Sequence, residues 1–290
     1  MDNPRARSVR QAGRPAVVAV LTLALAWAYL PSLRLMADRW ASDPRYSHGY
    51  FVPFFALGFL WVRRDERPTL SESSGATWCG LGLVAGAALV HFMGVYYYLP
   101  WIESAALVPS LAGLALIFGG VEGLRWAAPA IGFLLFMVPL PYRVEGWLAG
   151  PLQGSATRCS TFVLQTMGLP AFAEGNIITI NTSKIGVVEA CNGLGMLVTF
   201  TAISTGLALL VRRPVVEMAL IVLSSGPIAL LANVARITAT GLLREFGSGR
   251  IADAVYHDLA GWLMMPVAFA LLAIELRLLG RVFIAPARTS

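Results

Sequence analysis

The sequence has little charge. Only 13% of its 290 residues are charged, whereas 57% are hydrophobic, and its mean hydropathy is +0.68. These polar side chains are too few to cover the surface of a soluble globular protein. The chain is therefore expected to lie in a lipid bilayer. The net charge of +6 comes almost wholly from arginines grouped between apolar runs. Because these arginines form no basic stripe interleaved with polar residues, nucleic-acid binding is not supported.

Cysteine and histidine are also scarce, at three residues each. The cysteines have no CxxC spacing and the histidines are widely scattered, which argues against a zinc site and against a disulfide framework. We therefore expect neither a metal nor another cofactor.

Apolar runs long enough to cross a hydrocarbon core of about 30 Å predict an all-α integral membrane protein with about eight transmembrane helices. The first run resembles a signal peptide but continues past Ala28, so it is interpreted as an uncleaved anchor. Val144 to Met167 is a mixed segment, either interfacial or re-entrant. We expect one polytopic domain over residues 1–290, with no separate C-terminal periplasmic domain. The predicted spans are Pro15 to Met36, Tyr46 to Val62, Ala76 to Leu99, Ile102 to Val121, Trp126 to Leu140, Gly193 to Val211, Val215 to Leu243 and Leu259 to Leu279.

The arginines predict sidedness through the positive-inside rule. With both termini cytoplasmic, one set of arginines falls inside: Arg5, Arg7, Arg10, Arg14, Arg63, Arg64, Arg67, Arg212, Arg213, Arg277, Arg281 and Arg288. The loop around His48, the stretch from Tyr142 to Asn192 and the loop from Arg244 to His257 then all face outward. Within the second of these, two β-branched runs flank Asn181 to Lys184 and predict a small extracytoplasmic β-hairpin before the sixth span.

Cys191 is the first candidate for chemistry, because it stands where this hairpin gives way to a helix. Free backbone N–H groups and the positive helix end favour its thiolate, which is the nucleophilic form. Asn192 and Gly193 follow it and are candidate backbone donors. The alternative is a buried, inert cysteine.

Arg236 is the second candidate, because an arginine inside an apolar run costs free energy unless it faces the bundle interior and has a partner. Asn233 and Thr240 share its helical face and predict an inward polar stripe. The alternative is an arginine that extends to the outer headgroups.

His257 is the third candidate and opens the last predicted span. Asp253 or Asp258 could fix its tautomer and hold its charge. The alternative is an interfacial histidine. His48 is either a substrate-site residue or a loop residue packed on the bundle. Cys79 and Cys159 lack a basic neighbour and are interpreted as structural. Ser225 has no histidine placed to act as its general base, so a serine nucleophile is not expected.

At these residues the sequence resembles the exosortase/archaeosortase family, membrane enzymes that act like sortases. The resemblance rests on DPRYSHGYFVP from Asp43 to Pro53, Pro139 to Pro141 with Pro151 to Gln153, EGN from Glu174 to Asn176, VEACNGL from Val188 to Leu194, ANVARI from Ala232 to Ile237, and YHDLAG from Tyr256 to Gly261. It implies a triad of Cys191, Arg236 and His257.

The resemblance also implies the partner, a secreted protein whose C-terminal PEP-CTERM-like motif precedes a membrane helix and a basic tail. Cleavage would occur on the periplasmic side of a bacterial inner membrane, in an exopolysaccharide-associated sorting system, through a thioester resolved by water or by an amine. Membrane lipid would surround the enzyme. The alternative from another class is a non-catalytic carrier of a polysaccharide or lipid-linked intermediate, in which Arg236 binds an anionic substrate.

Overall fold

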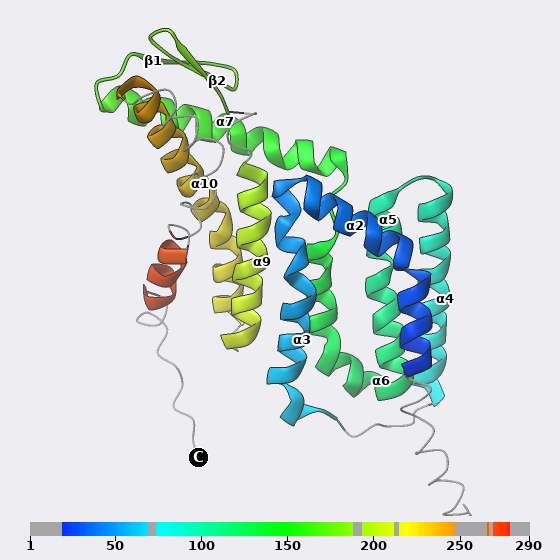
Figure 1. Cartoon of the computed structure of the whole chain (residues 1–290). Helices are drawn as coiled ribbons and strands as arrows, with labels where there is room; N and C mark the ends of the chain where they lie inside the picture. The colour runs from blue at the N-terminus through cyan, green and yellow to red at the C-terminus, as the bar shows by residue number, and fades with distance from the viewer. Residues whose placement is uncertain are drawn as a thin grey trace, which may run out of the picture. The chain divides into compact units, whose positions relative to one another are not determined.

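The computed structural model describes residues 19–68, 74–187, 193–211, 215–246, 266 and 269–278 (Figure 1). These residues are mostly helical, with one small sheet. The chain divides into two compact units, which are described separately. The first comprises Met1–Asp43 and Ser47–Pro139, and the second comprises Pro44–Tyr46 and Leu140–Ser290. The 3-10 helix η1 (Pro44–Tyr50) therefore contributes to both units.

The first unit begins with a bent pair of helices, Ala19–Ala28 and α2 (Leu30–Ser42), which meet at 59°. Pro31 lies in the first turn of α2. Its lack of a backbone N–H costs no helical hydrogen bond there, because the first N–H groups of a helix have no acceptor within the helix. The following helices are α3 (Val52–Val62), η2 (Arg64–Glu66), α4 (Ser74–Tyr96), α5 (Pro100–Ala105), α6 (Leu107–Phe133) and η3 (Leu134–Met137).

Helices α4 and α6 pack at a pair of glycines. A Cβ atom on Gly113 would lie 2.9 Å from the Gly80 carbonyl oxygen, and one on Gly80 would lie 2.8 Å from the Gly113 carbonyl oxygen. The two backbones can approach this closely only without side chains, which is the way small residues hold membrane helices together.

Helix α6 is interrupted at Gly120, whose φ of 63° and ψ of −162° are not helical. Glycine is the residue that adopts such a conformation without steric cost. The interruption falls at the end of the predicted span Ile102 to Val121, just before the predicted span Trp126 to Leu140. By length and composition, Pro100–Met137 counts as one candidate span, so two separate spans here stay a prediction.

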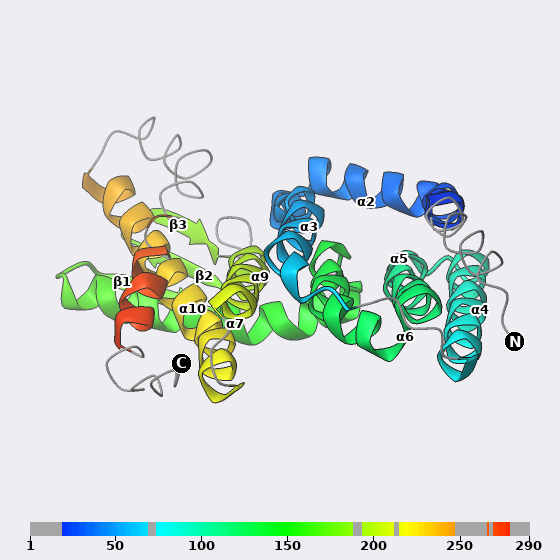
Figure 2. The same ribbon diagram turned by 90° about the horizontal axis from the view of Figure 1, so that it is seen from below.

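The second unit contains α7 (Tyr142–Thr166), the strands β1 (Ala171–Glu174), β2 (Ile177–Ile180) and β3 (Ser183–Gly186), α9 (Gly193–Val211), α10 (Val215–Phe246) and a helix over residues 269–278. Helices α9 and α10 lie side by side, and α7 crosses their ends (Figures 1 and 2).

The predicted β-hairpin is confirmed. Strands β2 and β3 are antiparallel, with Ile180 opposite Ser183, and Asn181 in the turn has a φ of 49°. Strand β1 adds to β2 and makes a three-stranded sheet in the order β1-β2-β3. This third strand was not predicted, because only Ala171 of its four residues is buried and no alternation marks it.

The sheet belongs to the core of the second unit. Ile178, Ile180 and Ile185 are buried together with Ala156 and Leu164 of α7 and Ile237 of α10. This core fixes the C-terminal half of α10 against α7, so the residues of α10 around Asn233 are held in a defined position.

Within the described residues, four helices are long and apolar enough to cross a membrane by length and composition: Ser74–Tyr96, Pro100–Met137, Gly193–Leu210 and Val215–Phe246. The bent pair at the start of the described chain raises the number to five. Helix α3 has 11 residues, fewer than the span predicted from Tyr46 to Val62 requires. The count of eight stays a prediction, and part of its last span, Leu259 to Leu279, lies outside the described residues. Val144 to Met167 falls within the single helix α7 and one residue beyond it.

Candidate functional site

Gly193 begins helix α9 at a point of close packing. A Cβ atom on this residue would lie 2.8 Å from Cδ2 of Leu152 on α7 and 3.0 Å from Nδ2 of Asn233 on α10. A side chain at this position would require the ends of the Leu152 and Asn233 side chains to move. The first turn of α9 is therefore enclosed by α7 and α10, two residues after Cys191 in the sequence.

Asn233 is fully buried, with 0% of its surface exposed. Neither its side-chain nitrogen nor its side-chain oxygen has a hydrogen-bond partner within the described chain. Burying an unpaired amide costs about 1–3 kcal/mol, so such a group calls for a specific explanation.

Arg236 lies one turn after Asn233 on α10 and is half-buried. Its backbone carbonyl accepts a hydrogen bond of 2.9 Å from the Thr240 hydroxyl. Asn233 and Thr240 are both buried, at 0% and 2% exposure, so the predicted inward direction of this polar stripe is confirmed. Arg236 thus belongs to the face of α10 that packs within the second unit.

The segment that carries Arg45 also approaches the first turn of α9, at Gly195. A Cβ atom on Gly195 would lie 3.0 Å from Arg45 Cα and 3.2 Å from its Cγ. The Arg45 guanidinium donates a hydrogen bond of 2.9 Å to the Glu145 carboxylate in the first turn of α7. Arg45 is therefore held between α9 and α7.

Tyr46 donates from its hydroxyl to the same Glu145 carboxylate across 2.5 Å, and the hydroxyl oxygen accepts from the Leu140 backbone N–H at 3.2 Å. Burial of the phenol, followed by its hydrogen bond to Glu145, raises the pKa of Tyr46 well above its ordinary value. The phenol stays protonated and remains a donor to the carboxylate. The sequence hypothesis gave Glu145 no role, although a lone acidic residue in the mixed segment was a signal for a buried partner.

A second polar contact lies next to Leu152. The Asn176 amide donates to the Gln153 side-chain oxygen at 3.2 Å and links the turn between β1 and β2 to α7. Both residues belong to sequence stretches on which the family resemblance rests. Their contact ties the sheet to the helix that encloses Gly193.

The other predicted site residues divide into two groups. Cys191, Asn192, Asp253, His257 and Asp258 lie outside the described residues. His48 lies in the first unit, where its Nε2 is 3.1 Å from the Phe136 carbonyl oxygen. This contact is the one expected of a loop residue packed on the bundle, the alternative to a substrate-site role.

Cys79 and Cys159 are free and exposed side chains on α4 and α7. No group of three or more metal-ligating side chains occurs in the part of the chain that the structure describes.

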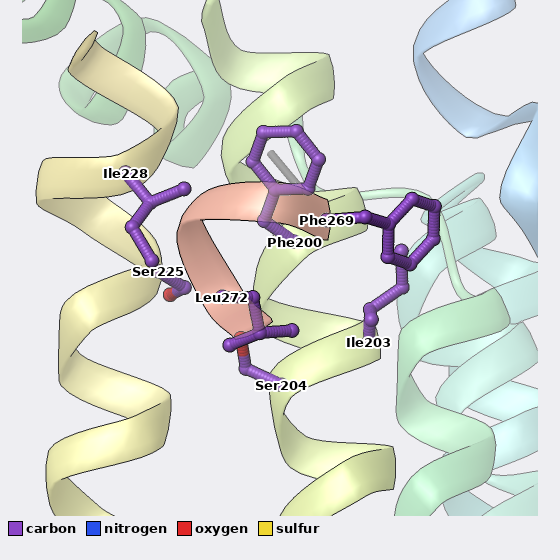
Figure 3. A pocket seen from close by; sticks show the side chains of 7 residues that line it. All are labelled: Phe200, Ile203, Ser204, Ser225, Ile228, Phe269 and Leu272. Carbon is purple, nitrogen blue, oxygen red and sulfur yellow. The ribbon is translucent and has the colours of Figure 1, made fainter. Parts of the chain in front are cut away.

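Ser225 lines a small, mainly apolar pocket between α9, α10 and the helix over residues 269–278 (Figure 3). Its hydroxyl donates to the Val222 carbonyl at 2.6 Å and lies 2.9 Å from the Thr201 hydroxyl. The pocket is lined by Phe200, Ile203, Ser204, Ser225, Ile228, Phe269 and Leu272. Because the hydroxyl is engaged by its own helix and by α9, the structure gives Ser225 a packing role.

The model of the transmembrane exosortase family (Exosortase_EpsH) matches residues 40–274, which is most of the chain. The chain belongs to the transmembrane exosortase family. Comparison with curated proteins and with solved structures gives no match. The matched range of this exosortase contains Cys191, Arg236 and His257, as well as Arg45, Glu145 and Asn233.

Family membership and the apolar helices together make this exosortase a multi-pass membrane protein. The family resemblance stated from the sequence is thereby confirmed. The described geometry adds that the start of α9 meets α7, α10 and the Arg45 segment, so it is the point in the second unit where several family stretches converge.

Proposed function

We propose that this exosortase is a membrane cysteine transpeptidase or protease that cleaves the C-terminal PEP-CTERM-type sorting signal of secreted proteins. The reaction takes place on the extracytoplasmic side of a bacterial inner membrane, with both termini of the enzyme in the cytoplasm. Cys191 is the nucleophile, Arg236 binds the developing negative charge and His257 transfers protons.

The observation that carries the proposal is the contact between Gly193 and Asn233. Gly193 follows Cys191 by two residues, and Asn233 precedes Arg236 by three. Their packing brings the turn of α10 that leads into Arg236 against the first turn of α9. Two stretches that are 40 residues apart in the sequence thus meet within one unit of the fold.

The first chemical step is attack of the Cys191 thiolate on the scissile carbonyl carbon. The sulfur–carbon bond forms while the carbonyl π electrons move to oxygen, which gives a tetrahedral oxyanion. Collapse of this intermediate breaks the carbon–nitrogen bond, and His257 gives a proton to the leaving amine. The product is a thioester between Cys191 and the substrate's new C-terminus.

The second step restores the enzyme. His257 removes a proton from water or from an amine, which attacks the thioester carbonyl, and the carbon–sulfur bond breaks to release the Cys191 thiolate. Water yields a free carboxylate, whereas an amine yields a new amide. Protease and transpeptidase activities therefore require the same residues.

Arg236 and the start of α9 supply positive charge to the oxyanion. The guanidinium is always protonated and carries several directed donors, and in a partly dry site its attraction for an anion exceeds that in water. The backbone N–H groups of Asn192 and Gly193 are the additional donors in this proposal, since the first N–H groups of a helix have no intrahelical acceptor.

The test uses the full chain in lipid nanodiscs with a substrate protein that ends in the motif, a membrane helix and a basic tail. Intact-mass spectrometry after acid quenching should detect a thioester adduct of the N-terminal substrate fragment on Cys191. Cys191→Ser should form no thioester and release no C-terminal fragment. Normal processing by this variant would contradict the proposal and favour the carrier, which needs no nucleophile.

A further inference from the structure

The carboxamide of Asn233 lacks the hydrogen bonds that several other buried polar groups of α10 make. Thr240 donates to the Arg236 carbonyl, and Ser225 donates to the Val222 carbonyl, so both hydroxyls are satisfied by their own helix. In the described part of the chain, the buried side-chain atoms without a partner are Nδ2 and Oδ1 of Asn233 and Oγ1 of Thr238. Asn233 therefore has two unpaired polar atoms, and Thr238 has one.

The position of this carboxamide is as unusual as its lack of partners. Its Nδ2 lies 3.0 Å from the Cβ position of Gly193, at the N-terminal end of the 19-residue helix α9. Asn233 also precedes Arg236 by one turn on α10. An amide donor, a helix N-terminus and an arginine are all groups that stabilise a negatively charged oxygen.

We propose that Asn233 is an oxyanion-binding residue whose Nδ2–H donates to the tetrahedral intermediate formed on Cys191. This inference rests on the proposed function, because the oxyanion arises when the cysteine thiolate adds to the scissile carbonyl and the π electrons move to oxygen. When the intermediate collapses to the thioester, the oxygen regains its double bond and the hydrogen bond from Asn233 weakens.

The burial of Asn233 favours a strong hydrogen bond. Its side chain is 0% exposed, so bulk water does not compete for the donor. The hydrogen bond forms to the oxyanion of the tetrahedral intermediate, and it contributes little to initial substrate binding. Its loss should therefore lower kcat and leave KM near the parent value.

The test compares two matched variants of α10 in the full chain. Asn233→Leu keeps the branching of the side chain at Cγ and removes both unpaired polar atoms. Thr238→Val is the control, because it removes the other buried, unpaired polar atom of the same helix without a role in the proposed reaction. The rate of thioester formation on Cys191 is followed in single-turnover experiments by quenched intact-mass spectrometry, and KM is measured from steady-state processing.

We expect Asn233→Leu to form the thioester roughly 10²- to 10³-fold more slowly, the scale seen on loss of one oxyanion donor, with KM unchanged. It should melt at or above the parent temperature, because an unpaired buried amide has been removed. Thr238→Val should react at the parent rate. Since a structural role for Asn233 predicts lower activity together with lower stability, the melting temperature separates the two explanations.

Parent-like acylation by Asn233→Leu would overturn the inference. So would a slow variant that also melts well below the parent, which would indicate that Asn233 supports packing. If Asn233→Leu fails to insert, Asn233→Ser serves instead, because its shorter side chain cannot reach the oxygen, and parent-like acylation would again contradict the proposal. Absence of a Cys191 adduct in the parent would instead reject the proposed function on which the inference depends.

Discussion

Arg45 and Glu145 form an ion pair of 2.9 Å between the 3-10 segment and the first turn of α7, although 100 residues separate them in the sequence. The Glu145 side chain is 8% exposed and that of Arg45 is 27% exposed. The carboxylate also accepts from the Tyr46 hydroxyl. The pair attaches a short segment of the chain to the helices that enclose the start of α9.

Removing Glu145 should destabilise the second unit. Glu145→Leu leaves the partly buried Arg45 without its carboxylate and should cost about 3 kcal/mol, the scale for a broken buried pair. Thermal unfolding in detergent measures the change. The double variant Arg45→Met/Glu145→Leu should recover part of the loss, and strictly additive effects of the two single changes would contradict this account.

A methyl group at Gly195 should push α9 away from the Arg45 segment. The new Cβ of Gly195→Ala would lie 3.0 Å from Arg45 Cα, a backbone atom that cannot rotate away. We expect a loss of about 1–3 kcal/mol in stability, as for overpacked cores. Gly226→Ala is the matched control because nothing lies within 4 Å of its Cβ position. It should be neutral or stabilising, by up to about 1 kcal/mol. Equal melting temperatures for the two variants would refute the packing argument.

Tyr46 should make stability decline at alkaline pH. The fold raises the pKa of Tyr46 above its ordinary value of about 10, through burial first and then the Glu145 hydrogen bond. The stabilisation is complete below about pH 10, and it is lost above that pH because the unfolded chain releases the phenol proton first. The stability advantage of the parent over Tyr46→Phe should therefore shrink as the pH rises above about 10 in melting experiments. An advantage that is independent of pH would disprove this role for the phenol.

The sidedness proposed from the arginines can be tested with a membrane-impermeant thiol reagent on intact cells. Cys191 should be labelled and Cys79 spared, with peptide mass spectrometry as the measurement. Permeabilised cells are the control and should allow labelling of the exposed Cys79. The reverse pattern in intact cells would overturn the topology. Full processing by Cys159→Ser would further exclude an essential disulfide between Cys159 and Cys191.

Arg236→Lys separates a catalytic role from extension to the lipid headgroups. Lysine keeps the charge but loses the planar fork of donors, so processing should slow by about 10²-fold while substrate binding persists. Arg244→Lys is a control on the same helix, since Arg244 is a half-buried residue two turns further along that donates to the Lys184 carbonyl. Near-parent rates for Arg236→Lys at matched expression would remove Arg236 from the mechanism and leave Cys191 with His257.

The sequence by itself determined the class of protein and several local elements. The excess of apolar residues requires a membrane, because water would not tolerate so much exposed hydrocarbon. The β-branched runs flanking Asn181 determined the hairpin, and the spacing of Asn233 and Thr240 determined which face of α10 is buried. Each of these follows from periodicity or composition within a short window of the chain.

Only the tertiary structure decided which distant residues meet. Local patterns cannot show that Arg45 reaches Glu145 or that Asn233 packs against Gly193, because these contacts depend on how α7, α9 and α10 cross. The same packing leaves the Asn233 carboxamide unpaired, since no described donor or acceptor is within its reach. The sequence specifies which polar side chains are present. Whether a buried polar group finds a hydrogen-bond partner depends on its neighbours in space.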